Sequence, residues 1–498
     1  MANVPSVQHI IQSSQKKLSP DERKRIERAY EYARKAHEGH LRESGVPYFS
    51  HTAATAENLA KIGADATTIT AGLLHDTVED TQLTIQDIRT EFGDEVAFLV
   101  DGVTKLGKLK YRGLKRHVET LRKLFLATAA DPRVILIKLA DRLHNLKTID
   151  ALPREKQERI ANETLEIYAP IAHRLGIGNI KGELEDVAFR VALPEEYTAT
   201  LALREEKSRE NVRQLRALSR ALSKLLGQAR ITVSSMDYRV KHLYSLYKKL
   251  QEKDMNIDRV YDIAALRVIV GTVEECYLAL GLVHNTWKPL PGRIKDYIAT
   301  PKKNGYQSLH TTIFTGDGAL VEVQIRTEAM HRTAEFGIAS HVGYKEKGGT
   351  SVDSSEGWVE KMFGRETKRV GGVSPVAAWI RDMAETQSDV AHPLSFIRDL
   401  KSDFFNARIF VFTPNGEVVD LPADASPIDF AYSIHSDLGD HAAGARVNGK
   451  FVALSTKLKH GDVVLIETKQ NSKPSHKWLE WVKTGAARKK IRTALEKN

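Results

Sequence analysis

The sequence predicts a multidomain protein with an all-α N-terminal domain, an α+β middle domain and a compact β-rich module near the C-terminus. The chain has 498 residues, a length that suggests about three domains. Residues from about 20 to 200 follow the helical period, with almost no alternating strand pattern. From Ile231 onward, runs typical of strands appear, and Pro-Asn-Gly at 414–416 and Asn-Gly at 448–449 predict hairpin turns.

Changes in composition along the chain predict five segments. They are the helical domain (1–195), the α+β domain with its leading connector helices (196–345), a linker and bridging helix (346–405), the β-rich module (406–470) and a basic C-terminal helix (471–498). In the α+β domain, 260–270 and 319–326 have the pattern of strands. In the β-rich module, residues 427–435 predict a helix.

The overall composition is that of a soluble globular protein, with 28% charged and 42% hydrophobic residues. A net charge of +10 favours polyanionic partners such as nucleotides or RNA. The single cysteine, Cys276, excludes an internal disulfide bond. Because the sequence contains neither a signal peptide nor a long apolar run, we expect a cytoplasmic protein without a membrane partner.

The most informative stretch holds His75-Asp76 and Glu79-Asp80 within six residues that read as helix. On a helix, residues four apart share a face, which would put His75 above Glu79 and Asp76 above Asp80. The neighbouring residues are apolar, and buried charges are costly unless they are paired or bind a metal. This pattern predicts a metal site with an acid/base pair beside it.

His51 and Asp141 complete the candidate metal site. Together with His75-Asp76 they form the pattern of an HD-type phosphohydrolase, and two imidazoles with two carboxylates suit a fairly hard divalent ion such as Mn2+. A bound metal lowers the pKa of its water, and Glu79 and Asp80 are then placed to orient that water or to shuttle its proton. The alternative is an acid cluster at a helix N-terminus with a solvated face.

Polar residues near this set predict a nucleoside pocket. Asn145 and Thr148 follow Asp141 by four and seven residues and share its helical face, as hydrogen-bonding groups for a base or ribose would. Arg42 and Ser44 precede His51 on an expected loop. His144, three residues after Asp141, is interpreted as a supporting or core histidine and not as a ligand.

A second site is predicted in the α+β domain. Lys241, Ser245 and Lys249 are spaced four apart, so on a helix they line one face that suits a polyphosphate. The alternative is an ordinary solvated basic face. Tyr306, which follows a glycine in a cationic run, could stack on a purine or simply pack in the core.

Two separated carboxylates lie on the strands of this domain. In the strand 319–326, Glu322 and Gln324 share the polar face, because side chains alternate along a strand. Asp262 leads the other, apolar strand. Carboxylates near a basic helix predict Mg2+ coordination and proton abstraction at a phosphoryl-transfer site.

Taken together, these motifs resemble those of the long-type RelA/SpoT homologues, from about residue 20 to the C-terminus. The family's hydrolase motifs match residues 42–45, 51, 75–80 and 141–148, and its synthetase motifs match residues 238–245, 261–263, 293–296, 304–310 and 321–326. The β-rich module is similar to a TGS domain through residues 411–416 and 429–435. Such proteins usually continue into further domains, so we expect a truncated or naturally shortened member.

The resemblance implies an HD-type hydrolase domain, a nucleotidyltransferase-like synthetase domain and a β-grasp TGS domain. It implies a bifunctional enzyme of the stringent response, which transfers pyrophosphate from ATP to the 3′-hydroxyl of GDP or GTP and hydrolyses the alarmone (p)ppGpp. Two alternatives are an enzyme with only one working half, and a ribosome- or tRNA-sensing protein whose catalysis is vestigial.

The resemblance also implies roles for single residues. Arg239 contacts the adenine of ATP, and its phosphates are held by Lys241, Ser245, Lys249 and Lys302. Asp262 binds Mg2+, and Glu322 binds metal or takes the proton of the acceptor hydroxyl. The guanine nucleotide is bound by Lys295, Asn304, Tyr306 and His310, and Gln324 is a further substrate-binding residue of the synthetase site. In the TGS domain, His435 contacts the 3′ end of deacylated tRNA; alternatively it is a helix C-terminal histidine favoured by the dipole.

Overall fold

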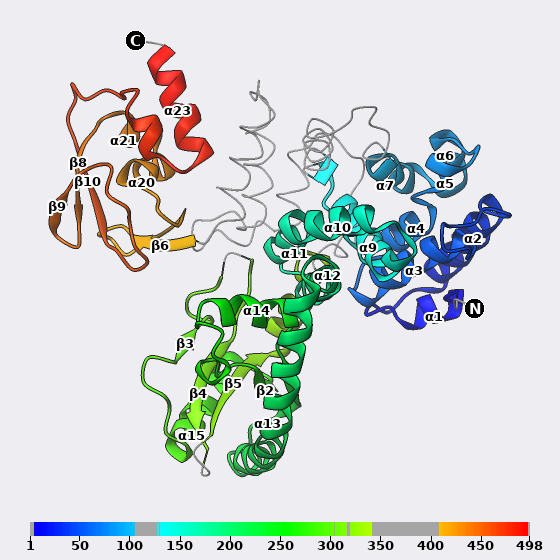
Figure 1. Ribbon diagram of the computed structural model, residues 1–498, viewed down its shortest axis with the longest axis horizontal. Coiled ribbons are helices and arrows are strands. Elements are labelled where there is room, and N and C mark those ends of the chain that lie inside the picture. The colour runs from blue at the N-terminus through cyan, green and yellow to red at the C-terminus, as the bar shows by residue number, and fades with distance from the viewer. Residues whose placement is uncertain are drawn as a thin grey trace. The chain divides into compact units, whose positions relative to one another are not determined.

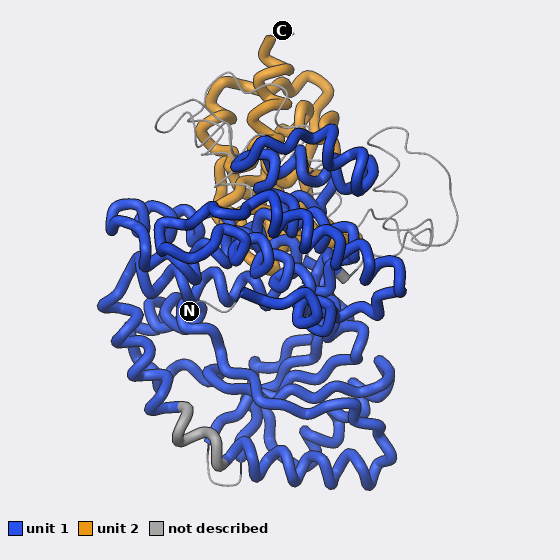
Figure 2. The backbone as a smooth tube through the Cα atoms, turned by 90° about the vertical axis from the view of Figure 1, so that its right-hand side faces the viewer, with its two compact units in different colours: residues 1–109, 123–381 blue, residues 110–122, 382–498 orange. Residues whose placement is uncertain are grey.

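The computed structural model describes residues 4–104, 127–128, 130–302, 304–315, 319–340 and 408–496. The chain divides into two compact units, 1–109 with 123–381 and 110–122 with 382–498 (Figure 2). The linker and bridging helix predicted at 346–405 lie outside the described residues. Within the described residues, no helix is both long and apolar enough to span a bilayer.

The N-terminal part of the first unit is helical, as predicted (Figure 1). Capping residues stabilise the N-termini of several of its helices. Ser19 and Glu22, for example, form a capping box at the start of α2. The helices before the sheet are α1 (Val7–Gln12), α2 (Pro20–Ala36), α3 (Phe49–Lys61), α4 (Ala66–Leu74), α5 (Thr77–Asp80), α6 (Ile85–Phe92), α7 (Asp94–Thr104), α9 (Arg133–Lys147), α10 (Arg154–Glu163), α11 (Ala169–Arg174), α12 (Gly178–Ala192) and α13 (Pro194–Gln228).

Close packing of α3 against α4 and α9 positions the candidate metal ligands. The α3 face is lined by small buried residues, including Ala53, Ala56 and Ala60. Gly72 of α4 faces Leu59, and a Cβ at Gly72 would lie 2.3 Å from Cδ1 of Leu59. The absence of side-chain bulk lets these helices approach closely, so that residues far apart in sequence meet between them.

The second part of this unit is a mixed sheet, which agrees with the predicted α+β domain. Its strand order is β1-β2-β5-β4-β3, and β2 and β5 run parallel. The elements are β1 (Val233–Val240), α14 (Leu243–Gln251), β2 (Ala264–Val270), α15 (Val273–Thr286), β3 (Lys295–Asp296), β4 (Leu309–Phe314), β5 (Leu320–Thr327) and α16 (Glu328–Phe336). The strands predicted at 260–270 and 319–326 are thus present as β2 and β5.

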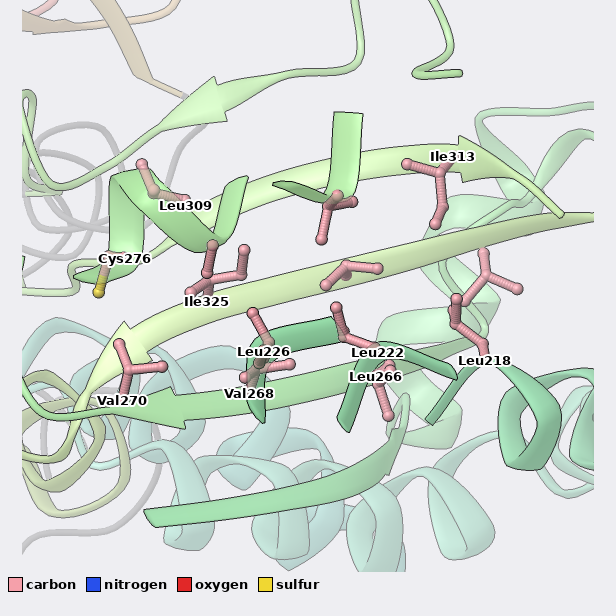
Figure 3. Packing of buried hydrophobic residues seen from close by; sticks show 14 of the residues in the cluster. Leu218, Leu222, Leu226, Leu266, Val268, Val270, Cys276, Leu309, Ile313 and Ile325 are labelled. Atoms are coloured by element: carbon pink, nitrogen blue, oxygen red, sulfur yellow. The ribbon is translucent and has the colours of Figure 1, made fainter. Parts of the chain in front are cut away.

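The long helix α13 covers one face of this sheet. Its residues Leu218, Leu222 and Leu226 pack against Leu266 and Val268 of β2 (Figure 3). The buried apolar cluster continues through α15 and β4. The opposite, polar face of β5 is therefore left for the second candidate site.

The helical part and the sheet are joined through a glycine-rich turn before α12. A Cβ at Gly176 would lie 2.8 Å from the backbone oxygen of Asn304, and one at Gly178 would lie 2.7 Å from that of Ala334. Gly337 has a φ of +51°, and the backbone of Leu175 lies against it. Only glycines fit such close approaches without displacing the backbone.

The second unit contains the predicted β-rich module. Its elements are β6 (Arg408–Phe412), β7 (Val418–Pro422), α20 (Pro427–Ile434), α21 (Ser436–Asp440), β8 (Ala442–Val447), β9 (Lys450–Val452), β10 (Val464–Thr468), α22 (Trp478–Trp481) and α23 (Gly485–Glu496). Both predicted hairpin turns connect strand pairs, β6 with β7 and β8 with β9. The buried Asp429 accepts hydrogen bonds from the backbone of Lys483 and Thr484, which ties α20 to the C-terminal helices.

Candidate active sites

Four predicted metal ligands meet in the helical domain, from α3, the turn between α4 and α5, and α9. Nε2 of His51 lies 3.3 Å from Oδ2 of Asp76 and 3.3 Å from Oδ1 of Asp141. Nε2 of His75 lies 3.1 Å from Oδ1 of Asp76. One donor atom each from His51, His75 and Asp141 falls within 4.8 Å of the others, which suits one metal ion.

Burial and charge also suit a divalent ion at this position. His51, His75 and Asp141 are buried, which excludes a solvated face for them. Nδ1 of His75 lies 2.8 Å from the Gly72 carbonyl oxygen, while its Nε2 faces the Asp76 carboxylate. Although burial opposes the charged imidazolium, the Asp76 and Asp141 carboxylates raise the pKa of His75 to about 9. A divalent ion would supply the positive charge that these carboxylates attract.

The prediction of one helix through His75 and Asp80 is wrong, because α4 ends at Leu74 and α5 begins at Thr77. Two side chains bond to carbonyls of the last α4 turn: Nδ1 of His75 to Gly72 and Oγ1 of Thr77 to Leu74, at 2.7 Å. Such bonds compete with the regular helix ladder.

The predicted acid/base pair lies beside the metal ligands. Glu79 and Asp80 are exposed on α5. Desolvation, together with the charges of Asp76 and Asp80, raises the pKa of Glu79. A carboxyl with a raised pKa takes up and releases a proton more readily near neutral pH, as the predicted shuttle requires.

Arg42 forms hydrogen bonds with two predicted nucleoside-binding residues, Asn145 of α9 and Thr148, which follows the end of that helix. Its guanidinium donates to Oδ1 of Asn145 at 2.8 Å and to Oγ1 of Thr148 at 3.2 Å. Asn145 in turn donates to Asp141 at 2.5 Å. Ser44 lies exposed in the same loop as Arg42. The hydrogen bonds therefore join three of the four predicted binding residues to a metal ligand.

Sequence reasoning missed two supporting residues of this site. Tyr48 donates its hydroxyl proton to Oδ2 of Asp76 at 3.0 Å. Lys138 forms an ion pair with Asp141 at 2.5 Å, and the charge of Lys138 outweighs burial and lowers the pKa of that carboxyl strongly. The spacing of three between Lys138 and Asp141 on one helix was a readable signal for this pair.

In the sheet domain, Asp262 lies just before β2 and forms ion pairs with Lys241 and Lys249. These two charges overcome the effect of burial and lower the pKa of Asp262 to about 2. Lys241 precedes α14 and is not on its helical face, contrary to the simple spacing argument. An ionised carboxylate beside two lysines suits Mg2+ and phosphate binding. Phosphate oxygens can replace the carboxylate as partners of the two lysine ammonium groups, and the carboxylate can then bind Mg2+.

The polar face of β5 carries the second predicted carboxylate. Oε1 of Glu322 lies 2.6 Å from Nδ1 of His310 and 3.3 Å from Nε2 of Gln324. Burial opposes ionisation of Glu322, but the hydrogen bond and charge of His310 outweigh it, so its pKa is lowered. The hydroxyl of Tyr306 lies 2.7 Å from Nε2 of His310. Glu322, Gln324, His310 and Tyr306 thus form one connected polar group.

Predicted nucleotide-binding cations surround this group. The ammonium group of Lys302 lies 5.1 Å from the ring centroid of Tyr306. Burial and the charges of Lys295 and Arg239 contribute to lowering the pKa of Lys302 to about 8. Lys295 is paired with His310 in the sheet register, and Arg239 is exposed on β1. Cations clustered in this way are suited to polyphosphate binding.

Two predicted nucleotide-binding residues contact the helical domain. Oγ of Ser245 donates to Oε2 of Glu185 at 3.0 Å and accepts from Nζ of Lys181 at 2.8 Å. Nδ2 of Asn304 donates to the backbone oxygen of His173 at 3.1 Å. Lys181 and Glu185 lie on α12, and no sequence pattern indicates this tertiary contact.

Three regions of the chain match models of known protein families. Residues 29–178 match an HD domain, residues 238–349 match the region found in RelA/SpoT proteins, and residues 409–468 match a TGS domain.

Three curated relatives match nearly the whole chain. A GTP pyrophosphokinase of Streptomyces coelicolor is 45% identical over 98% of this chain and 57% of its own length. A guanosine-3′,5′-bis(diphosphate) 3′-pyrophosphohydrolase of Aquifex aeolicus is 45% identical over 96% of this chain and 65% of its own length. The bifunctional (p)ppGpp synthase/hydrolase SpoT of Escherichia coli is 44% identical over 96% of this chain and 66% of its own length.

The chain thus spans between 57% and 66% of the length of these relatives. Its three matched regions follow one another in the order that the motifs predict. The HD region contains the predicted metal ligands, the RelA/SpoT region contains Asp262 and Glu322, and the TGS region contains His435. The chain therefore belongs to the RelA/SpoT family, with the HD, RelA/SpoT and TGS regions of its long type.

Proposed function

We propose that this chain both makes and degrades (p)ppGpp, as implied by the names of its relatives. The HD domain hydrolyses (p)ppGpp to GDP or GTP and pyrophosphate, and the sheet domain transfers pyrophosphate from ATP to the 3′-hydroxyl of GDP or GTP. The observation that carries the proposal is that two separate polar sites are formed within one unit. One is centred on His75, and the other is centred on Glu322.

In the proposed hydrolase, His51, His75, Asp76 and Asp141 hold a divalent ion, with Mn2+ as the proposed metal. When bound, such an ion lowers the pKa of a coordinated water. Glu79 and Asp80 would orient a water molecule at this site and take up or release its proton. Arg42, Ser44, Asn145 and Thr148 hold the nucleoside part of the substrate.

In the proposed synthetase, the protein aligns two nucleotides and neutralises charge. Lys241, Ser245, Lys249 and Lys302 hold the ATP phosphates, and Arg239 contacts the adenine. Tyr306 stacks on guanine, while Lys295, Asn304 and His310 hold the acceptor nucleotide, and Gln324 is a further substrate-binding residue. Asp262 is the proposed Mg2+ ligand. Glu322 either binds metal or accepts the proton of the 3′-hydroxyl.

Two incubations of the purified protein test this proposal. With ATP, GDP and Mg2+ we expect (p)ppGpp, and with ppGpp and Mn2+ we expect GDP and pyrophosphate. Activity in only one incubation would favour an enzyme with one working half. Inactivity in both, together with tRNA binding, would favour a sensing protein with vestigial catalysis.

The contacts of α12 support a proposed coupling between the two sites. This helix packs against α9, which carries Asp141, and against α14, which carries Ser245. Lys181 and Glu185 of α12 bond directly to Ser245. Both activities together would form a futile cycle, so we propose two conformations, each competent in one reaction. A nucleotide shifts such a balance only through its differential affinity for the two conformations.

We predict that nucleotides held in the synthetase site slow ppGpp hydrolysis, by a factor between about five and about a hundred. The measurement is the hydrolysis rate at fixed ppGpp and Mn2+ while a non-reactive ATP analogue and GDP are added. Tyr306→Ala is expected to weaken this effect without altering the metal site. If the hydrolysis rate did not change although a binding measurement confirmed that the synthetase site was occupied, the two sites would not be coupled.

For the TGS domain, we propose that His435 helps to contact the 3′ end of deacylated tRNA. The residue is exposed, and the basic helix α23 packs against α20, which ends just before it. Nδ1 of His435 accepts the backbone N–H of Asp437 at 3.2 Å. Since this bond leaves the proton on Nε2, Nε2 is the atom that can donate to tRNA.

We predict that His435→Ala and His435→Asn both weaken tRNA binding in a salt titration. An asparagine Oδ1 can replace Nδ1 as the acceptor for Asp437 and so preserves the start of α21, but it lacks the Nε2–H donor. Wild-type affinity of His435→Asn would show that the ring does not contact tRNA. Loss in His435→Ala alone would assign the effect to the helix cap.

A further inference from the structure

His144 lies where the metal ligands and the nucleoside-binding residues meet. Its Nδ1 lies 2.8 Å from Nδ1 of His51 and 3.2 Å from Nη1 of Arg42. The Arg42 guanidinium has only donors, so Nδ1 of His144 must present a lone pair to it. The proton of a neutral His144 therefore lies on Nε2.

This assignment fixes the proton on His51. Two facing nitrogens at hydrogen-bond distance need one proton between them, and His144 does not supply it at Nδ1. Nδ1 of His51 is then the donor, which leaves the lone pair on Nε2. Nε2 is the atom that lies 3.3 Å from both Asp76 and Asp141, in the metal site.

The two histidine ligands are fixed in different ways. His75 donates its Nδ1 proton to the backbone carbonyl of Gly72, a partner that no side-chain substitution removes. His51 instead depends on the side chain of His144. A substitution of His144 should therefore affect the tautomer of His51 that can bind a metal through Nε2, and leave His75 unaffected.

We propose that His144 is a positioning residue for the proposed metal site. Its Nδ1 accepts from His51, which keeps Nε2 of His51 free for the metal, and it accepts from Arg42, which holds the substrate-binding guanidinium beside the metal. This inference rests on the proposed role of the site in divalent-ion binding. It adds a link between metal affinity and substrate binding through one acceptor atom.

Three substitutions separate this role from simple packing. In His144→Asn, Oδ1 can occupy the place of Nδ1 and accept both hydrogen bonds. His144→Leu removes the acceptor, and His144→Gln moves its polar atoms out toward the position of Nε2. We expect Mn2+ affinity to fall by a factor between about 10 and about 100 in the Leu and Gln variants, and by less than about threefold in the Asn variant.

Calorimetric titration with Mn2+ gives the affinities without relying on hydrolysis. The rate of (p)ppGpp synthesis in the same samples, which depends on the other site, checks that each variant is folded. Wild-type affinity in a folded Leu variant would overturn the inference while leaving the metal site intact. Equal losses in Asn, Gln and Leu would also overturn it, because packing and not the acceptor would then matter. Absence of binding by the wild type would overturn the metal site itself.

Discussion

Replacing His75 or Asp76 with alanine is expected to abolish ppGpp hydrolysis and to leave synthesis unchanged. Each substitution removes a proposed metal ligand from the buried site between α3, α4 and α9. Nε2 of His75 faces the Asp76 carboxylate, and Asp76 contacts both histidine ligands. The measurement is the initial rate of ppGpp loss with Mn2+, beside the rate of synthesis with Mg2+.

Asp94→Ala is a matched control, because Asp94 belongs to the same domain but its side chain is 90% exposed. We expect wild-type hydrolysis from this variant. Chelation of the wild type should reproduce the loss, and added Mn2+ should restore the rate. Undiminished hydrolysis by protein stripped of metal would contradict the proposed role of these ligands.

The meeting of the four proposed metal ligands was predictable because their residue types and order are restrictive. Two histidines and two carboxylates have few other reasons to recur among apolar residues. The interruption of the helix at His75 and Asp76 was not predictable from the same pattern. It depends on Thr77 and His75 bonding to particular carbonyls, and spacing alone does not separate this turn from a continuous helix.

The synthetase site shows a second limit of reading a sequence. The alternation along β5 placed Glu322 and Gln324 on one face, since the strand period is strictly two. The contacts of Ser245 with Lys181 and Glu185 could not be read in this way. They depend on which helix packs against α14, and the hydrophobic period gives the buried face of a helix without identifying its neighbour.

Glu322→Gln is expected to lower the rate of (p)ppGpp synthesis by at least about two orders of magnitude. The substitution keeps the shape of the side chain and removes its negative charge. In the structure, Oε1 of Glu322 lies 2.6 Å from Nδ1 of His310, and the hydrogen bond and charge of His310 lower the pKa of this carboxyl. A glutamine amide can still accept a hydrogen bond from His310, so the fold of β5 and β4 should survive while metal binding or proton acceptance is lost.

If Glu322 accepts the proton of the acceptor hydroxyl, the loss is expected mainly in kcat. Glu328→Gln, at the exposed start of α16, provides a control with the same chemical change outside the site. Hydrolysis of ppGpp by both variants would verify folding. A Glu322→Gln rate within about threefold of the wild type would remove this carboxylate from the chemistry, since general acid–base catalysis contributes at least about a hundredfold.

Titration with Mg2+ then distinguishes the two proposed roles of Glu322. If the carboxylate binds metal, the variant should need more Mg2+ and recover part of its rate at high concentration, because Asp262 and the ATP phosphates still offer oxygen ligands. If it accepts the proton, saturating Mg2+ should leave the rate low, since an amide cannot take up that proton. Because His310 keeps the ionised form of Glu322 stable, we expect the first result: a carboxylate with a lowered pKa is a weak base but remains a good ligand for a hard cation.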